Sequence, residues 1–282
     1  MYRNTKNVPY YVFGRGSLAQ LGDLLKPRRE AVDGPVVYFV DHFFRDHELI
    51  GRLPMEKGDQ LHFVAFKEAV SAADSRTPCC VVGIGGGNAL DTAKAVANLL
   101  TNPGKAEDYQ GWELVKNPAV YKIGIPTLSG TGSECSRTCV LTNIPKNLKL
   151  GMNSDYTVYD QLLLDPDLLA TVPRDQYFYT GIDTFMHCVE SLQGSYRNAI
   201  IDAFSVRAVQ LCEEIFLSDD MMSEDNREKM MIASYIGGMA AGNVGVIHPF
   251  SAGLGVVLHV AHGLGNCLAL NVLGDIYPKE YK

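Results

Sequence analysis

The sequence has 282 residues, of which 46% are hydrophobic and 20% are charged, and this composition is typical of a folded globular protein rather than a disordered one. Its length suits one large domain or two domains of ordinary size. The formal net charge of −7 argues against nucleic acids and anionic membrane surfaces as partners. The first residues lead into no apolar signal sequence, and no apolar stretch approaches the roughly 18 residues of a transmembrane helix, so we expect a cytoplasmic protein.

Strand and helix signals alternate through the first half of the chain. Short apolar runs rich in β-branched residues predict buried strands at residues 36–40, 61–64, 79–84 and 121–126. Apolar residues at helical spacing predict helices at residues 65–73 and 88–100. Because strands separated by helices pair in parallel, this alternation indicates an α/β domain with a mostly parallel sheet.

The second half of the chain has only helical patterns. Apolar residues recur every three or four positions in residues 173–192, 198–217 and 224–239. Residues 164–167 (LDPD) form the link to these helices, because the residue before a proline is disfavoured in helical conformation. We therefore predict an α/β domain over residues 1–168 and an all-helical domain over residues 169–282.

A cluster of glycines follows one predicted strand and opens the next predicted helix. It comprises Gly85, Gly86, Gly87 and Asn88. Glycines allow a ligand to approach the backbone, and the free N–H groups of a helix N-terminus attract a pyrophosphate. The spacing is not G-x-G-x-x-G, so a simple tight turn is the alternative interpretation. We interpret the cluster as a phosphate-binding loop for a dinucleotide.

Asp41 follows the predicted strand at residues 36–40. An acidic side chain at the carboxyl end of such a strand can accept hydrogen bonds from the adenosine ribose, and it repels the 2′-phosphate of NADP. The alternative is that Asp41 caps the segment that follows it. The first interpretation favours NAD over NADP.

A second polar loop leaves the predicted strand at residues 121–126. Its hydroxyl side chains can hold phosphate or ribose, and they include Thr127, Ser129 and Thr131. The alternative interpretation is that Ser129 or Ser133 caps a helix that begins in this loop. We predict that the three hydroxyls contribute to the cofactor site.

Histidines gather in the predicted helical domain. Asp183 and His187 are four residues apart, so they share one face of a helix. A carboxylate and an imidazole are competent ligands for zinc or ferrous ion, although such a pair is also a common surface hydrogen bond. His248 precedes Pro249 at a predicted helix start, and His259 and His262 follow it. One aspartate and three histidines would complete a metal site, but spacing alone does not choose between His259 and His262.

Four segments of the sequence resemble consecutive motifs of the iron-containing (group III) alcohol dehydrogenase family. They are residues 85–94 (GGGNALDTAK), 126–134 (PTLSGTGSE), 180–187 (TGIDTFMH) and 248–255 (HPFSAGLG), in the family's order. The resemblance extends over nearly the whole chain. It implies that residues 1–168 form a nucleotide-binding α/β domain and residues 169–282 a helical metal-binding domain, an architecture like that of dehydroquinate synthase.

The resemblance also implies which residues bind metal. In the family the fourth ligand lies fourteen residues after the third, in an H-G pair, and His262-Gly263 lies fourteen residues after His248. The implied ligands of one divalent ion, Fe²⁺ or Zn²⁺, are therefore Asp183, His187, His248 and His262. Gly263 is itself predicted to break the chain's helical structure.

Cofactor and catalytic residues follow from the same resemblance. Asp91 belongs to the family's glycine-loop motif, and Lys149 resembles a family lysine near the nicotinamide cofactor. Ala252 replaces a second histidine that many members carry near the substrate, and His259 is the predicted substitute in the proton path. The resemblance implies that the metal polarises the hydroxyl of an alcohol while a hydride passes to the nicotinamide of NAD, or of NADP. It also implies a homodimer.

Two segments are similar to one branch of the family. Residues 108–114 (DYQGWEL) and 248–253 (HPFSAG) resemble the branch that oxidises the C8 hydroxyl of 3-deoxy-D-manno-octulosonate (Kdo) in lipopolysaccharide sugar biosynthesis. This narrower resemblance implies a coupled aminotransferase as a functional partner. The alternatives are a metal-dependent sugar-phosphate cyclase of the dehydroquinate synthase type and a non-catalytic nucleotide-binding relative. Compared with the family pattern, the sequence is short near residues 64–65 and 238–243 and after residue 282.

Overall fold

The structure is a computed structural model that describes residues 6–65, 77–143, 145–146, 148–194, 197–241 and 245–276. The chain divides into two compact units. The first, the sheet unit, contains the chain up to Thr127 together with Ser133–Asn143 and Leu150–Asp165. The second, the helical unit, contains the chain from Pro166 onward together with Leu128–Gly132 and the short stretch that ends at Lys149.

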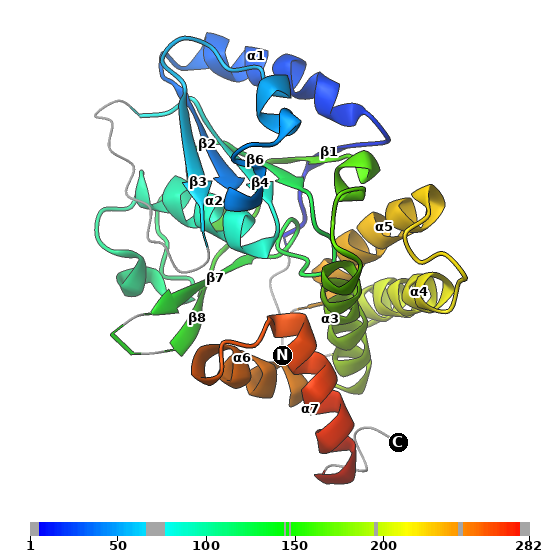
Figure 1. Cartoon of the computed structure of the whole chain (residues 1–282). Coiled ribbons are helices and arrows are strands. Elements are labelled where there is room, and N and C mark those ends of the chain that lie inside the picture. The colour runs from blue at the N-terminus through cyan, green and yellow to red at the C-terminus, as the bar shows by residue number, and fades with distance from the viewer. Residues whose placement is uncertain are drawn as a thin grey trace. The chain divides into compact units, whose positions relative to one another are not determined.

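A six-stranded parallel sheet forms the centre of the sheet unit (Figure 1). Its strand order is β1 (Tyr10–Phe13), β9 (Gln161–Leu164), β6 (Lys122–Pro126), β4 (Cys80–Gly85), β2 (Val36–Asp41) and β3 (Gln60–Val64), and neighbouring strands pair in parallel. The four predicted strands are confirmed as β2, β3, β4 and β6. The parallel sheet confirms the predicted α/β class, whereas β1 and β9 were not predicted.

Burial explains why β2 and β4 form the middle of this sheet. All residues of β4 and the first five of β2 are buried, because both faces of a parallel sheet are covered by other elements. The helix α2 (Gly87–Leu99) packs Ala89 and Ala93 against Val37 and Phe39 of β2 and Val81 of β4. Full burial of one such valine or phenylalanine contributes about 1.5–3 kcal/mol, so the sheet and α2 hold the loop between them firmly.

Shorter elements complete the sheet unit. The helix α1 (Leu21–Ala31) is joined by the 3-10 helices η1 (Ser17–Gln20), η2 (His42–Phe44), η3 (Glu48–Arg52), η4 (Ala106–Tyr109) and η5 (Asp155–Thr157). A small second sheet has the order β5 (Gly111–Trp112), β8 (Leu148–Asn153) and β7 (Thr138–Asn143), and it was not predicted. The predicted helix at residues 65–73 lies, apart from its first residue, outside the described residues.

The helical unit contains five α-helices after the 3-10 helix η6 (Pro166–Leu169) in the described part of the chain. They are α3 (Arg174–Gln193), α4 (Ala199–Phe216), α5 (Glu224–Ala240), α6 (Ile247–Val257) and α7 (His262–Ile276). The first three confirm the predicted helices, and α3 contacts α4, α5 and α7. Side chains of Asn198 and Ser223 cap α4 and α5 by accepting main-chain hydrogen bonds. In the described residues, none of the helices combines the length and apolar character that a membrane span requires.

Gly263 does not break the helical structure, and the prediction of a break there is wrong. α7 begins at His262, so that Gly263 is its second residue. A Cβ atom on Gly263 would lie 1.8 Å from the carbonyl oxygen of Tyr179 in α3. Glycine is therefore needed for the close approach of two helix backbones, not for a turn.

Candidate metal centre and cofactor loop

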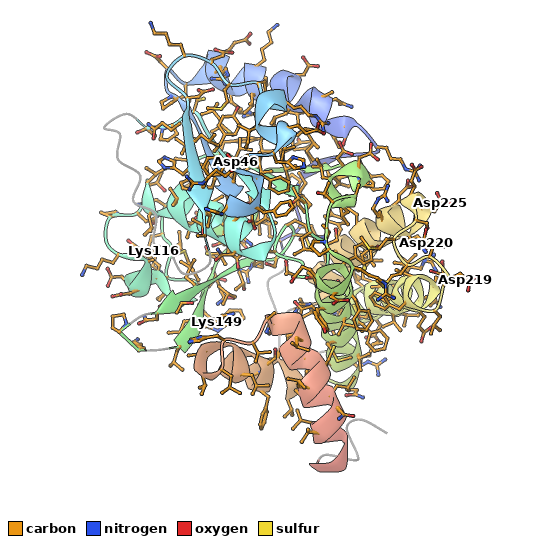
Figure 2. The ribbon with its side chains drawn as sticks, in the orientation of Figure 1. Asp46, Lys116, Lys149, Asp219, Asp220 and Asp225 are labelled. Carbon is orange, nitrogen blue, oxygen red and sulfur yellow. The ribbon has the colours of Figure 1, made fainter. Side chains whose placement is uncertain are left out.

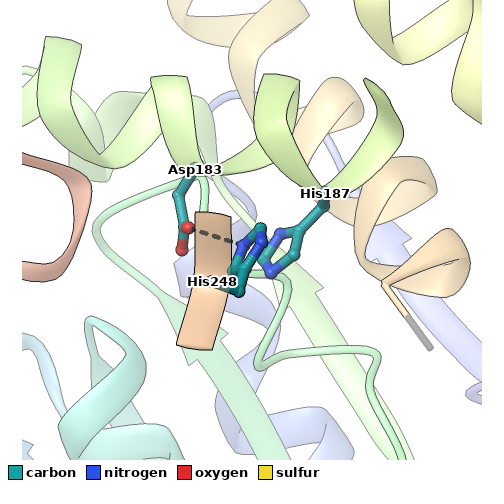
Figure 3. Close-up of side chains that lie close together, drawn as sticks. All are labelled: Asp183, His187 and His248. Carbon is teal, nitrogen blue, oxygen red and sulfur yellow. Dashed lines mark ion pairs between the residues drawn. The ribbon is translucent and has the colours of Figure 1, made fainter. Parts of the chain in front are cut away.

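Three of the four predicted metal ligands form a compact buried cluster. Asp183 and His187 lie one turn apart on α3, and His248 lies near the start of α6 (Figure 3). Each offers one ligand atom, and these atoms all lie within 4.8 Å of one another. The exposed fractions of the three residues are 3%, 7% and 6%. This burial excludes the alternative interpretation, in which Asp183 and His187 form an ordinary hydrogen bond at the surface.

The fourth predicted ligand approaches the same carboxylate. His262 Nε2 lies 3.4 Å from Asp183 Oδ1, and His248 Nε2 lies 3.3 Å from that oxygen. The rings of His187 and His248 stack with centroids 4.3 Å apart. The four predicted ligands, one carboxylate and three imidazoles, therefore lie close together in the helical unit.

The cluster fits a divalent cation. His187 Nδ1 and His248 Nε2 are buried and make no hydrogen bond with described residues. A buried polar atom without a hydrogen bond is costly, and a cation bound by these nitrogens and by Asp183 would remove that cost. Imidazole nitrogen and carboxylate oxygen are the donor set that suits Zn²⁺ and Fe²⁺.

The protonation of the four groups follows from burial and from their mutual charges. Burial alone would raise the pKa of Asp183, but the neighbouring His262, His187 and His248 hold it well below its usual range. Burial lowers the pKa of His187 to about 4, and burial also lowers that of His262. Burial would lower the pKa of His248 as well, but the neighbouring carboxylates of Asp183 and Glu190 raise it to about 9. Two of the imidazoles are thus kept neutral, which is the form that donates a lone pair to a metal.

Sequence reasoning missed three buried polar residues that contact the predicted ligands, namely Glu190, Ser251 and Asn266. Each follows a predicted ligand histidine by three or four residues and lies on the same helix as that histidine. Asn266 Nδ2 donates a hydrogen bond to Asp183 Oδ1. Helical spacing could have identified these residues as candidates, but only the packing of the helices shows which ligand each one contacts.

Lys149 and His259, the two predicted catalytic residues, lie in different surroundings. Lys149 is half-buried, and a Cβ atom on Gly255 of α6 would lie 3.7 Å from its Nζ; Figure 2 labels it. Its positive charge contributes to the lowered pKa of His262. His259 is exposed between α6 and α7 with a φ of 58°, and it is not part of the compact cluster. Its catalytic role stays a prediction.

The glycine loop has the geometry of a close turn at the end of the parallel sheet. β4 ends at Gly85, and Gly86 precedes α2 without any side chain that caps the helix. Gly85 has a φ of 148°, and a Cβ there would lie 2.8 Å from the Cβ atoms of both Asp41 and Ala89. Because no side chain caps α2 at Gly86, the amides of its first turn remain available to an anion, as an anion-binding helix N-terminus requires. Asn88 donates a hydrogen bond to the carbonyl of Ala65.

Asp41 is the last residue of β2 and caps the 3-10 helix that follows. Its Oδ1 accepts a hydrogen bond from Phe43 N at 3.0 Å. The capping interpretation is thus confirmed. Contact of Asp41 with a ribose stays a prediction, since a carboxylate has acceptor capacity beyond one hydrogen bond.

Asp91 has partners within the sheet unit on both of its carboxylate oxygens. Ser133 Oγ donates to Oδ1, and Val140 N donates to Oδ2 at 2.9 Å. Lys94, completely buried, lies 3.6 Å from Oδ1 and donates to the carbonyls of Ser133, Ser136 and Thr138. Burial raises the pKa of Asp91 although Lys94 and Ser133 oppose the rise. These contacts give Asp91 a structural function, and its predicted part in cofactor binding stays a prediction.

The second polar loop divides between the two units. Thr127 N donates to Gly85 O at 3.1 Å, so in the sheet unit the exits of β6 and β4 lie side by side. In the helical unit, Gly130 N donates to Ser234 Oγ and Gly130 O accepts from Thr184 Oγ1. No helix begins in this loop, and β7 starts at Thr138, so the helix-cap alternative is wrong.

The remaining two hydroxyls of that loop have different environments. Ser129 is buried, and its Oγ makes no hydrogen bond with the described residues. Thr131 is half-buried. Binding of a cofactor by Thr127, Ser129 and Thr131 stays a prediction.

Comparison with known proteins agrees with this combination of a glycine loop and a helical metal cluster. The model of the iron-containing alcohol dehydrogenase family matches residues 60–166, and the model of the family's C-terminal part matches residues 177–278. The chain therefore belongs to the iron-containing alcohol dehydrogenase family. The first match contains the glycine loop, and the second contains all four predicted metal ligands.

Individual relatives include the sulfoacetaldehyde reductase of Bilophila wadsworthia, which is 38% identical over 190 residues, or 65% of this chain and 49% of the relative. The NAD-dependent methanol dehydrogenase of Bacillus methanolicus is 33% identical over 190 residues, or 66% of this chain and 50% of the relative. The chain thus spans about half the length of these relatives. The solved structure of an alcohol dehydrogenase from Oenococcus oeni matches with a TM-score of 0.84 and 25% identity, over 95% of this chain and 74% of that one.

Proposed function

We propose that this chain is a metal- and NAD-dependent oxidoreductase that interconverts a primary alcohol and its aldehyde. The buried cluster of Asp183, His187 and His248 carries this proposal, because its unsatisfied nitrogens fit a cation. Family membership supports the same reaction class. Sugar-phosphate cyclisation, the alternative enzyme class, has no support in the two family matches.

Each part of the chain has a distinct task in this proposal. Asp183, His187, His248 and His262 hold the divalent ion. When bound, the ion supplies Lewis-acid stabilisation of negative charge on the substrate oxygen. The glycine loop at residues 85–87 holds the pyrophosphate of NAD by main-chain N–H groups, and Asp41 accepts from the ribose.

The substrate that we propose is a small aldehyde or primary alcohol that carries a negative charge. Lys149 supports a negatively charged substrate, because its ammonium group lies close enough to His262 to help lower the pKa of that imidazole. One relative is named for sulfoacetaldehyde, an anionic aldehyde. Kdo is also anionic, but the C8 oxidation of Kdo, its aminotransferase partner and a homodimeric assembly rest on the sequence resemblance and stay predictions. A cytoplasmic location, which we expect from the apolar pattern of the sequence, stays a prediction as well.

Metal content and turnover together test the proposed function. We expect about one iron or zinc ion per chain in protein purified without oxygen or chelator, and oxidation of NADH in the presence of sulfoacetaldehyde. Asp183→Ala should lose the ion and lower the rate by about 10²–10³-fold, because several kcal/mol of stabilisation disappear. The matched control is Asp219→Ala, which removes an exposed aspartate of the same helical unit (Figure 2). Asp219→Ala should change neither the metal content nor the rate of NADH oxidation.

The substrate class can fail separately from the reaction. Turnover of acetaldehyde that equals or exceeds turnover of sulfoacetaldehyde would contradict the anionic substrate while leaving the reaction intact. A native chain that binds no metal after reconstitution, or that binds metal and NADH but turns over no aldehyde or alcohol, would overturn the proposed reaction.

A further inference from the structure

Glu190 connects the metal cluster to the start of helix α6. It lies on α3, only 1% exposed, one turn after His187. Its Oε1 accepts a hydrogen bond from Ile247 N at 2.6 Å, and its Oε2 contacts His248 Nδ1. The start of α6 has no side-chain cap of its own, so Glu190 supplies that cap from another helix.

The contact with Glu190 determines where the proton of His248 lies. A carboxylate only accepts hydrogen bonds, so His248 Nδ1 must carry the hydrogen. In the neutral ring, Nε2 then has the lone pair, and Nε2 is the atom that lies 3.3 Å from Asp183 Oδ1. Glu190 thereby directs the metal-binding nitrogen of His248 toward the cluster.

Ser251 has the same effect on His262. Its Oγ lies 2.6 Å from His262 O and 2.8 Å from His262 Nδ1. The hydroxyl has one proton, and a carbonyl oxygen only accepts, so the proton goes to the carbonyl and Oγ must accept from Nδ1–H. His262 Nε2 therefore has the lone pair, and it lies 3.4 Å from the same oxygen of Asp183.

We propose that Glu190 and Ser251 are positioning residues that hold His248 and His262 as Nδ1–H tautomers, so that both Nε2 atoms are reserved for one metal ion. This inference rests on the proposed function, because it assumes that the cluster binds metal. Hydrogen bonds from ligand histidines to such partners orient the rings and strengthen the ligands, and loss of one partner typically lowers metal affinity about 10–100-fold.

Glu190→Gln tests the inference with almost no change of shape. The glutamine amide has one acceptor oxygen and one donor NH₂ group, whereas Ile247 N and His248 Nδ1 both present hydrogens. The amide cannot satisfy both. If its oxygen remains with Ile247, its NH₂ group favours the tautomer of His248 with hydrogen on Nε2, which cannot bind metal through that nitrogen.

The experiment is a titration of the full chain with Zn²⁺ in competition with a chelating indicator. We expect Glu190→Gln to bind Zn²⁺ about 10–100-fold more weakly than the native chain, and Ser251→Ala to bind it about tenfold more weakly. Asp165→Asn is the matched control, since Asp165 is a completely buried carboxylate of the sheet unit that accepts from Gly16 N and Leu18 N. It should lower the melting temperature and leave the Zn²⁺ affinity unchanged.

A spectroscopic readout tests the tautomers directly. In the zinc-loaded native chain labelled with ¹⁵N-histidine, we expect His248 and His262 to show a protonated Nδ1 and a zinc-shifted Nε2. Coordination of either ring through Nδ1 would overturn the inference.

The outcomes separate this inference from the function on which it rests. A native chain that binds Zn²⁺, with Glu190→Gln within twofold of it, overturns the inference alone. A native chain that binds no Zn²⁺ overturns the proposed function and this inference together. If Glu190→Gln does not fold, Ser251→Ala decides the matter, because it removes one hydroxyl, and an unchanged affinity in that variant overturns the inference.

Discussion

The glycine loop of the sheet unit and the histidine cluster of the helical unit are held in place by different kinds of interaction. At the loop, main chain determines position: Gly85 adopts a φ of 148°, and Lys94 donates to several backbone carbonyls. At the cluster, side chains hold other side chains, as Glu190 does for His248 and Asn266 for Asp183. We therefore expect the loop to be sensitive to backbone conformation and the cluster to the chemistry of single side-chain atoms.

The largest effect on stability is expected from Lys94→Met. The ammonium of Lys94 is completely buried, is bonded to the carbonyls of Ser133, Ser136 and Thr138, and lies 3.6 Å from Asp91 Oδ1. Its removal takes one hydrogen bond from each carbonyl and leaves the buried Asp91 without this cation. We expect the free energy of unfolding to fall by about 3–5 kcal/mol, the range for breaking a buried charged contact. Urea denaturation measures the change.

The control for that variant is Lys116→Met. Lys116 is exposed and donates to a single carbonyl, that of Glu113 (Figure 2). Its replacement should change the free energy of unfolding by less than about 0.5 kcal/mol. Equal effects of the two substitutions would show that the network around Lys94 does not stabilise the sheet unit.

A smaller effect is expected from Gly85→Ala, which should weaken the loop without altering the cluster. The positive φ and the contacts at 2.8 Å with Asp41 and Ala89 should together cost about 2–4 kcal/mol of stability. Weaker NADH binding and unchanged Zn²⁺ affinity should accompany that loss. Fluorescence titration with NADH and indicator titration with Zn²⁺ measure the two affinities.

The helical unit offers the matched glycine for this substitution. Gly253 lies within α6, and a Cβ there would meet no atom within 4 Å. Gly253→Ala should therefore stabilise the protein by about 0.5–1 kcal/mol, because alanine is the better helix former. A loss of Zn²⁺ affinity in Gly85→Ala would break the proposed independence of loop and cluster.

The smallest effect is expected from Asp41→Asn, which keeps a capping side chain but removes its charge. Stability should change by less than about 0.5 kcal/mol, because asparagine caps as well as aspartate does. If Asp41 also repels the 2′-phosphate of NADP, the preference for NADH over NADPH should fall by about 1 kcal/mol, or roughly fivefold. Dissociation constants for both cofactors decide between the roles, and an unchanged ratio would leave Asp41 as a cap alone.

The central strands of the sheet could be predicted from sequence because burial on both faces requires continuous apolar runs, as in β2 and β4. The outer strands lack that signal. In β1, Tyr10 and Tyr11 are 68% and 57% exposed, and β9 has only four residues, three of them leucines that suit a helix equally well. The partners that these strands find lie far away in the sequence, so the local pattern did not indicate them.

The cluster of predicted ligands could be proposed from the sequence for a different reason. Asp183 and His187 are joined by helical spacing, but His262 was distinguished from His259 by family resemblance and not by physical reasoning. The positioning residue Glu190 escaped prediction because its contact with His248 depends on how α3 and α6 pack. Periodicity identifies which side chains share a helix face, whereas contacts between faces require tertiary structure.

Gly130 has a consequence for how the protein assembles. Its hydrogen bonds join the chain across 104 residues to Ser234 and across 54 residues to Thr184, next to the predicted metal ligand Asp183. During synthesis from the N-terminus, the segment Leu128–Gly132 is complete before α3 and α5 exist, so these helices can fold around a strand connector that is already present. A fragment that starts at Pro166 contains every predicted metal ligand, yet it leaves the hydroxyls of Thr184 and Ser234 without this partner. We therefore expect the helical fragment that starts at Pro166 to be less stable when it is expressed alone than within the full chain. Addition of a peptide that spans residues 128–132 should stabilise the fragment again.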